Sequence, residues 1–414
     1  MSGQLTPAPK VVIVYRYVPH YRVRFYELLR EKLAAHGVTL EVVYGQPLGE
    51  DASKDDAGAL SWGCVIHNRA IRVAGRELIW QPCLNHVAGA DLVIVEQASR
   101  LVVNYVLLIR QAIGRQPTAF WGHGRKFQDT SAIAASEWVK RRISKWPAWW
   151  FAYNETSASV VRDLGYPSDR ITVVENSIDT KSLAAARDSV VASEVEALRD
   201  ELGLSGHNVC VYCGGMYAEK RLGFLLEAAT LLRESVPDFE LVLAGAGTDA
   251  HLAAEASATH PWVKYIGTVF GRRKAALFAT AKLHLMPGLV GLAVLDSFVM
   301  EVPLVTTAVT YHSPEIEYLS DGRNGLIVPE ASSPSAFAVA TATLLGDDAR
   351  LESMKTACRA DARRYTIENM AERFCGGVLS ALSYPRSSDA DATMLAPSAA
   401  VDGDPASQRE TESK

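Results

Sequence analysis

The sequence predicts an α/β protein built from two doubly wound domains with parallel sheets. Short apolar segments rich in Val, Ile and Leu alternate along the chain with amphipathic helical patterns. This alternation is typical of βα units whose sheets are covered on both faces. With 414 residues, the chain is too long for one ordinary core and suits two domains.

The order of the patterns divides the chain into four parts. Residues 1–180 are expected to form an N-terminal Rossmann-like domain, with strand patterns KVVIVYRYV, TLEVVYG, DLVIVEQ and PTAFWGHG. Residues 181–206 are rich in Ala, Glu and Arg and predict a helical connector. Residues 207–385 repeat the strand and helix alternation and predict a second Rossmann-like domain. Residues 386–414 lack aromatic residues and predict a disordered tail.

The composition favours a cytoplasmic globular protein. A net charge of -5 with 48% hydrophobic residues gives no reason to expect a nucleic-acid partner. The six cysteines are thinly spread, which favours a reducing compartment. Cys210 and Cys213 form a C-x-x-C motif, but in a strand this spacing places them on opposite faces, so a structural role is expected. Neither a secretory signal nor an apolar run of roughly 18 to 20 residues is found.

A glycine loop with two cations opens the second domain. Gly214 and Gly215 follow the strand pattern NVCVYC, and Lys220 and Arg221 stand just before an amphipathic helix. A cation at a helix start opposes the helix dipole, so an anionic ligand is favoured there. A solvated lysine is the alternative interpretation.

A second glycine loop contains Gly245 and Gly247, between a strand pattern and a helix. Glycines at this point let a phosphate approach the backbone. Together with Ala250 they also match the G-x-G-x-x-A pattern of dinucleotide binding. The next strand pattern, VKYIGTV, offers no acid for a ribose, which argues against a nicotinamide enzyme.

A third loop lies in LHLMPGLVGLAVLDSF, which predicts a buried strand, a glycine loop and a helix. The loop is expected to present free backbone N–H groups to an anion; its residues are Gly288, Leu289, Val290, Gly291 and Leu292. Asp296 follows about one turn into the helix, where a carboxylate can accept hydrogen bonds from ribose hydroxyls. Beyond the next strand, Tyr311, His312 and Glu315 lie on the side where open α/β sheets bind ligands.

These motifs resemble retaining glycosyltransferases of the GT-B fold, specifically glycosyltransferase family 4, also called group 1. The resemblance runs from roughly Val11 to Tyr384 and is most specific from Gly214 to Val328. It implies two Rossmann-like domains that face each other across a cleft. It also implies that Lys220 binds the donor diphosphate.

Further motifs carry the same resemblance. Asp296 stands where the family has a ribose-binding glutamate, and His123, between two glycines, matches a histidine near the donor sugar. The segments NSIDT and SPEIEYLSDGRNGLIV resemble the family's hinge and closing motifs. Two positions depart from the pattern: Met216 replaces an arginine, and Gly288 replaces a glutamate near the donor sugar.

The implied function is transfer of a sugar from a nucleoside diphosphate sugar to an acceptor hydroxyl, in glycan, glycolipid or polysaccharide biosynthesis. The family transfers with retention of configuration, without a metal and with no cofactor besides the donor. The implied catalytic residues are His123, Lys220 and Asp296. The implied substrate-binding residues are Gly214, Gly215, Arg221, Gly245, Gly247, Gly288, Leu289, Val290, Gly291, Leu292 and Glu315, with His20 and Arg22 on the acceptor side. Two alternatives remain: a protein that binds a nucleotide sugar without transferring it, and a nucleotide-sugar epimerase.

The acceptor is an unidentified glycan or a lipid-linked molecule. The segment VKRRISKWPAWWFAYN mixes cations with tryptophans, which is compatible with peripheral contact to an anionic membrane at its inner face. The alternative is a basic helix that runs into a buried strand.

Overall fold

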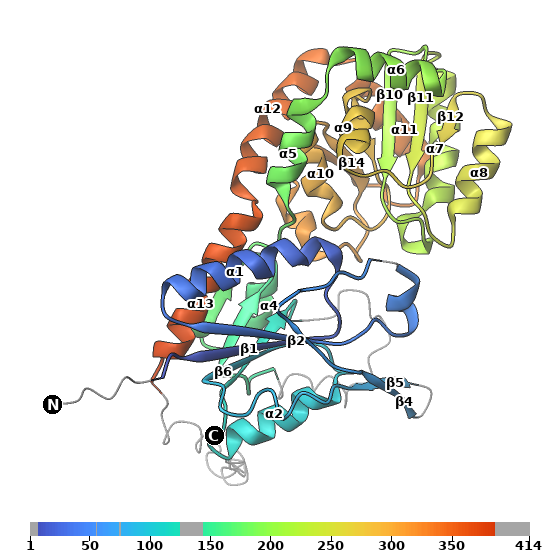
Figure 1. Ribbon diagram of the computed structural model, residues 1–414. Helices are drawn as coiled ribbons and strands as arrows, with labels where there is room; N and C mark the ends of the chain where they lie inside the picture. Colours follow the sequence, from blue (N-terminus) through green and yellow to red (C-terminus); the bar gives the residue numbers. More distant parts are fainter. Residues whose placement is uncertain (1–6, 55, 74–75, 125–143, 386–414) are drawn as a thin grey trace, which may run out of the picture.

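In the computed structural model the chain folds into two α/β lobes, in agreement with the predicted fold class (Figure 1). The structure describes residues 7–54, 56–73, 76–124 and 144–385. The predicted tail, 386–414, lies outside the described residues. None of the described helices is long and apolar enough to cross a membrane.

The N-terminal lobe is built around a parallel sheet with the strand order β3-β2-β1-β6-β7-β8-β9. The central strands are almost entirely apolar, so both faces of the sheet are buried. The strands are β1 (Lys10–Tyr15), β2 (Thr39–Tyr44), β3 (Cys64–Val65), β6 (Leu92–Glu96), β7 (Thr118–Gly122), β8 (Trp149–Ala152) and β9 (Ile171–Val173). The helices are α1 (Val23–Ala35), α2 (Val102–Ala112) and α4 (Glu155–Asp163), with short 3-10 turns η1 (His20–Arg22), η2 (Gly49–Lys54) and η3 (Ser168–Arg170).

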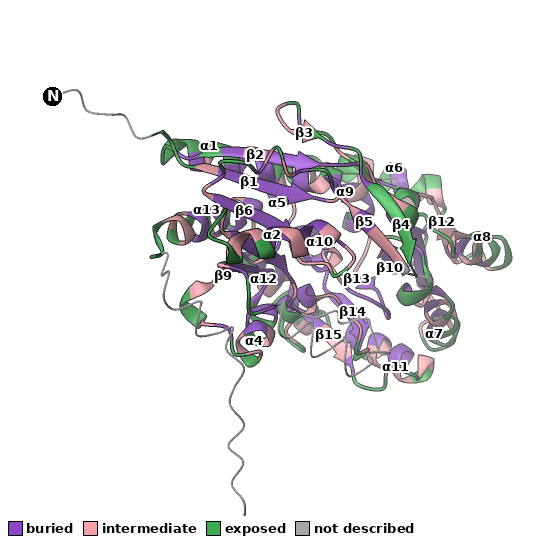
Figure 2. Ribbon diagram, turned by 90° about the horizontal axis from the view of Figure 1, so that it is seen from below, coloured by how far each residue is buried: buried purple, intermediate pink, exposed green. Residues whose placement is uncertain are grey.

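A small antiparallel pair, β4 (Arg69–Val73) and β5 (Arg76–Trp80), lies outside this sheet. All five residues of β4 are exposed, in contrast to the buried central strands (Figure 2).

The C-terminal lobe contains a second parallel sheet with the order β12-β11-β10-β13-β14-β15. Its strands are β10 (Asn208–Cys213), β11 (Phe239–Ala244), β12 (Val263–Tyr265), β13 (Leu283–Leu285), β14 (Leu304–Thr307) and β15 (Gly325–Val328). Its helices are α7 (Leu222–Ser235), α8 (Ala250–Thr259), α9 (Gly271–Ala279), α10 (Ala293–Met300), α11 (Pro334–Leu345) and α12 (Asp348–Arg364), with 3-10 turns η4 (Ala218–Lys220) and η5 (Pro314–Tyr318). Cys210 and Cys213 pack into the cores on opposite faces of this sheet, which confirms their structural role.

The predicted connector forms two helices, α5 (Thr180–Ser189) and α6 (Ala192–Leu202). Leu183 and Leu198 pack into a core on one face of the C-terminal sheet. The connector therefore belongs to the C-terminal lobe rather than standing between the lobes.

The last helix, α13 (Ile367–Ser383), returns to the N-terminal lobe (Figure 1). Ile367, Met370 and Phe374 pack into the same core as α1 and β1, and the ring of Phe374 stacks on that of Phe151. The predicted C-terminal domain, 207–385, thus contributes its final helix to the other lobe.

The carboxyl ends of the two sheets face each other. The turn η5 comes after β14, and α4 begins directly after β8. Glu317 on η5 accepts a hydrogen bond of 2.6 Å from the backbone N–H of Thr156, and the Asn154 side chain donates to the backbone oxygen of Pro314. Loops at the carboxyl ends of both sheets therefore lie next to the contact between the lobes.

The predicted basic and aromatic segment is only partly described. Trp149 and Trp150 are buried in β8, whereas Lys145 and Trp146 are exposed. The remaining cations of that prediction, Lys140, Arg141 and Arg142, lie outside the described residues. The strand interpretation is correct for residues 149–152.

Candidate active site

Lys220 is a buried cation at the carboxyl end of the C-terminal sheet. The side chain is 6% exposed, and its ammonium donates a 2.6 Å hydrogen bond to the backbone oxygen of Leu289. The ammonium also lies 5.5 Å from the centre of the Tyr217 ring. Burial lowers the pKa of Lys220 to about 8, although nearby Glu219 opposes this effect. The structure thus places a positive charge of low hydration beside the loop before α10.

The loop 287–291 packs directly on the backbone of η4. The N–H of Leu289 donates to the oxygen of Glu219, 2.8 Å away. A Cβ added at Gly288 would lie 2.2 Å from that same oxygen and 2.5 Å from the carbonyl carbon of Lys220. Glycine at 288 is therefore required by this close packing, and no side chain fits there without moving Lys220.

Two N–H groups of the loop that is predicted to bind an anion have acceptors within the protein. Leu289 is engaged by Glu219, and the N–H of Val290 donates to Nδ1 of His312 at 3.0 Å. His312 Nε2 lies 2.7 Å from the Thr307 oxygen, so the imidazole is neutral with its proton on Nε2. Burial also lowers the pKa of His312.

The backbone N–H groups of Gly291 and Leu292 lie at the start of α10. Within the described parts of the chain, no acceptor stands opposite the backbone N–H of Gly291 or of Leu292. A Cβ at Gly291 would lie 3.3 Å from the hydroxyl oxygen of Ser313, so this position is less crowded than Gly288. These N–H groups and the ammonium of Lys220 flank the same loop, an arrangement suited to an anion.

Asp296 lies on α10 and is 8% exposed. Its carboxylate pairs with the ammonium of Lys274 on α9, 2.7 Å away. This pairing raises the pKa of Lys274 even though burial acts in the opposite direction. The sequence does not predict a role for Lys274. It follows Arg272 and Arg273, and three consecutive cations at the start of a helix are typical of an exposed surface.

Gly245 and Gly247 serve backbone packing. A Cβ at Gly245 would lie 1.9 Å from the oxygen of Gly214, and one at Gly247 would lie 2.1 Å from the oxygen of Met216. Both have φ values near +150°, a conformation that favours glycine. Glycine at these two positions allows the close packing of loop 214–216, and their part in donor binding stays a prediction.

Two other predicted groups have structural partners. Arg221 donates to the hydroxyl of Thr307 at 3.3 Å and to the oxygen of Ala331, and its guanidinium lies 4.0 Å from the centre of the Phe224 ring. Gly215 accepts a hydrogen bond from the Tyr212 hydroxyl through its backbone oxygen. Arg221 therefore anchors the start of α7 to the end of β14.

His123 follows β7 in the N-terminal lobe and is half-buried. Its imidazole packs edge-on against the Tyr153 ring, with 4.1 Å between ring centres. Burial and the positive charge of Arg22 lower the pKa of His123 to about 4. The imidazole is therefore neutral at physiological pH and can act as a hydrogen-bonding group rather than as a cation.

Arg22 and Glu315 are buried in the contact between the lobes, and their roles in substrate binding stay predictions. Arg22 is 1% exposed and donates to the side-chain oxygen of Asn176, while Asn176 donates to Glu315. Burial raises the pKa of Glu315. The guanidinium of Arg22 also lies 5.2–6.0 Å from the ring centres of Tyr21, Phe25, Trp121 and Tyr153. His20, by contrast, is exposed, and its acceptor role stays a prediction.

A second charged group at the carboxyl end of the N-terminal sheet was not predicted. Arg16 follows β1 and pairs with Glu96 at 2.7 Å and with Asp51 at 2.6 Å, and Asp51 also pairs with Arg100 at 2.8 Å. Arg16 lies in the segment VYRYVPHYR, and this sequence does not indicate which of its arginines is buried. The ion pair with Glu96 holds the side chain of Arg16 in a half-buried position.

Two parallel doubly wound sheets with facing carboxyl ends, joined by a helix that crosses back, define the GT-B fold. Anabaena HepE (Alr3699), solved in complex with UDP, superposes on this chain with a TM-score of 0.66 and 14% sequence identity. The match covers 90% of this chain and 100% of that one.

Residues 207–347 match the family described as "Glycosyl transferases group 1". Alpha-D-kanosaminyltransferase of Streptomyces kanamyceticus is 27% identical over 202 residues, which are 46% of this chain and 51% of that protein. Phosphatidyl-myo-inositol mannosyltransferase of Mycobacterium leprae is 27% identical over 157 residues, 36% of this chain and 41% of that protein. The chain spans about half the length of these relatives or less, and the family match falls on the lobe that holds Lys220.

Proposed function

We propose that this protein is a glycosyltransferase that moves a sugar from a nucleoside diphosphate sugar to an acceptor hydroxyl. The observation that carries the proposal is the buried ammonium of Lys220 beside the start of α10, inside the segment that matches group 1 glycosyl transferases. Cleavage of the donor places negative charge on the leaving diphosphate. A preorganised cation in a site of low hydration stabilises that charge strongly.

Each remaining group has a distinct task in this proposal. The N–H groups of Gly291 and Leu292 bind a phosphate oxygen, and Asp296, held by Lys274, accepts hydrogen bonds from the ribose. Neutral His123, from the other lobe, hydrogen-bonds the donor sugar. The acceptor enters from the side of His20, and transfer proceeds with retention and without a metal.

The test is release of nucleoside diphosphate from a panel of nucleotide sugars, with UDP-glucose among them, in the presence and absence of a metal chelator. We expect one donor to be turned over equally well with the chelator. NMR of the product is expected to show the anomeric configuration of the donor. Inversion of configuration would refute retention, and release abolished by chelator would refute metal independence.

A nucleotide-sugar-binding protein without transferase activity is the second candidate. It is favoured by Gly288, because the packing of this residue on η4 leaves no room for a carboxylate near the donor sugar. If nucleotide sugars raise the melting temperature but none is turned over with any glycan or lipid-linked acceptor supplied, this candidate replaces the transferase.

A further inference from the structure

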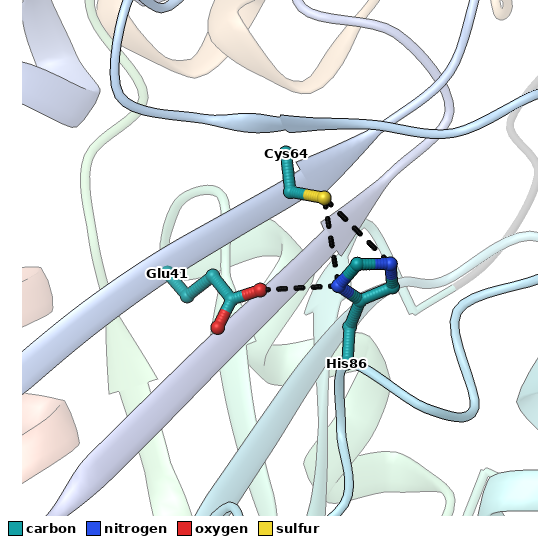
Figure 3. A group of neighbouring side chains, drawn as sticks. All are labelled: Glu41, Cys64 and His86. Atoms are coloured by element: carbon teal, nitrogen blue, oxygen red, sulfur yellow. Dashed lines mark hydrogen bonds and ion pairs between the residues drawn. The ribbon is translucent and has the colours of Figure 1, made fainter.

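Three side chains with metal-binding atoms meet on the N-terminal lobe, away from the proposed donor site. They are Glu41 on β2, Cys64 on edge strand β3, and His86 in the segment that precedes β6 (Figure 3). One ligand atom from each lies within 4.8 Å of the other two. All three side chains are half-buried, so an ion can reach them from solvent.

The distances between these atoms fit a zinc ion. Cys64 Sγ lies 3.5 Å from His86 Nδ1, and Glu41 Oε1 lies 3.3 Å from the same nitrogen. With usual Zn–S, Zn–N and Zn–O bond lengths and tetrahedral angles, the sulfur and nitrogen would be about 3.5 Å apart, and the nitrogen and oxygen about 3.4 Å apart. These two spacings match, but the sulfur also lies 3.6 Å from His86 Nε2, so the imidazole ring must turn to direct Nδ1 at the ion.

The chemistry of the three groups also selects the metal. A thiolate, an imidazole and a carboxylate suit zinc, whereas calcium and magnesium prefer oxygen alone. The other carboxylate oxygen of Glu41 is held by the ammonium of Lys10 at 2.8 Å. This contact fixes the carboxylate so that Oε1 faces the imidazole, in the manner of the outer partners that orient metal ligands.

We propose that Glu41, Cys64 and His86 bind one zinc ion, with a water molecule in the fourth position. The thiol of Cys64 passes its proton to solvent as the Zn–S bond forms. The ion links edge strand β3 to β2 and to the segment before β6. It therefore stabilises the N-terminal lobe and takes no part in sugar transfer.

The experiment uses the full chain, stripped of metal with a chelator and titrated with zinc in competition with a chromophoric chelator. We expect one ion per chain, a rise in melting temperature, and affinity lowered on the order of 100-fold in Cys64→Ser and in His86→Asn. His67→Asn is the matched control, because His67 is an exposed histidine near Cys64 and outside the cluster. Equal zinc affinity in the wild type and Cys64→Ser would overturn the proposal.

A second measurement needs no variant. Cys64 is half-buried, while Cys83, Cys210, Cys213, Cys358 and Cys375 are buried. Iodoacetamide should therefore alkylate Cys64 first in the native protein, and zinc should protect it. Substitution of cobalt for zinc should give the absorption of a thiolate-to-cobalt charge transfer. Unchanged alkylation with zinc, or cobalt bound without this absorption, would refute ligation by Cys64.

Discussion

Replacement of Lys220 by methionine is expected to stabilise the fold and to weaken catalysis. Burial lowers the pKa of Lys220 from 10.5 to about 8. At 1.36 kcal/mol per pKa unit, the charged ammonium therefore costs the folded state about 3 kcal/mol at pH 7. Lys220→Met removes this cost but leaves the oxygen of Leu289 without its hydrogen bond, which costs about 1 kcal/mol. The variant should be more stable by about 2 kcal/mol.

The size of this stability difference depends on pH. Because the folded state has the lower pKa, the cost is fully present below pH 8 and declines as the pH rises toward 10.5, where the unfolded chain also loses the proton. The stability advantage of Lys220→Met over wild type should therefore decline across this range.

The assay is urea unfolding at pH 7 and at pH 10, with release of nucleoside diphosphate measured at pH 7. Release should fall on the order of 100-fold or more. Lys181→Met, at an exposed lysine on α5, is the control and should change neither property. A less stable Lys220→Met variant, or a stability difference that does not change with pH, would refute the reasoning about burial. Unchanged turnover would refute the role in donor binding.

Three further perturbations test the packing around the site. Gly288→Ala should lower both stability and nucleotide-sugar affinity, because its Cβ would lie 2.2 Å from a backbone oxygen. Gly223→Ala, whose Cβ would meet nothing within 4 Å, should be neutral or stabilising by about 1 kcal/mol. Thermal melts with and without donor would distinguish the two variants. Burial lowers the pKa of His123 to about 4 and that of His284 to about 3. The contribution of both histidines to stability should be complete above pH 6.5 and decline at lower pH, where the unfolded chain binds protons that the folded chain does not. In urea unfolding, His284→Gln should show a smaller loss of stability from pH 7 to pH 4 than the wild type. Asn176→Ala should destabilise the protein by about 3 kcal/mol, since it removes the hydrogen bonds of one side-chain amide to both Arg22 and Glu315, which are buried. An unchanged urea midpoint would contradict this.

The order and type of the regular elements could be predicted from the sequence. Strands such as VVIVY and FELVLA are apolar throughout because both faces of a parallel sheet are covered, and this pattern is local. The positions of Cys210 and Cys213 could be predicted for a similar reason. Side chains alternate between the two faces of a strand, so residues three apart lie on opposite faces. The position of Lys220 after the first strand of the second lobe was also visible in the sequence.

The environment of individual groups was decided by tertiary packing. In the sequence, Arg22 is one of several cations next to aromatic residues. Its burial in the contact between the lobes follows from its hydrogen bond to Asn176, which is distant along the chain. The sequence around Gly245 predicts a phosphate-binding loop, but the close approach of Gly245 to the oxygen of Gly214 follows only from the tertiary structure.

By itself, then, the sequence determined the α/β class, the two sheets and the loops at their carboxyl ends, because hydrophobic periodicity acts over neighbouring residues. The tertiary structure decided which N–H groups stay free, which lobe receives α13, and that Glu41, Cys64 and His86 come together. These features depend on contacts between segments far apart in the chain, and burial, partners and pKa values are properties of such contacts rather than of local sequence.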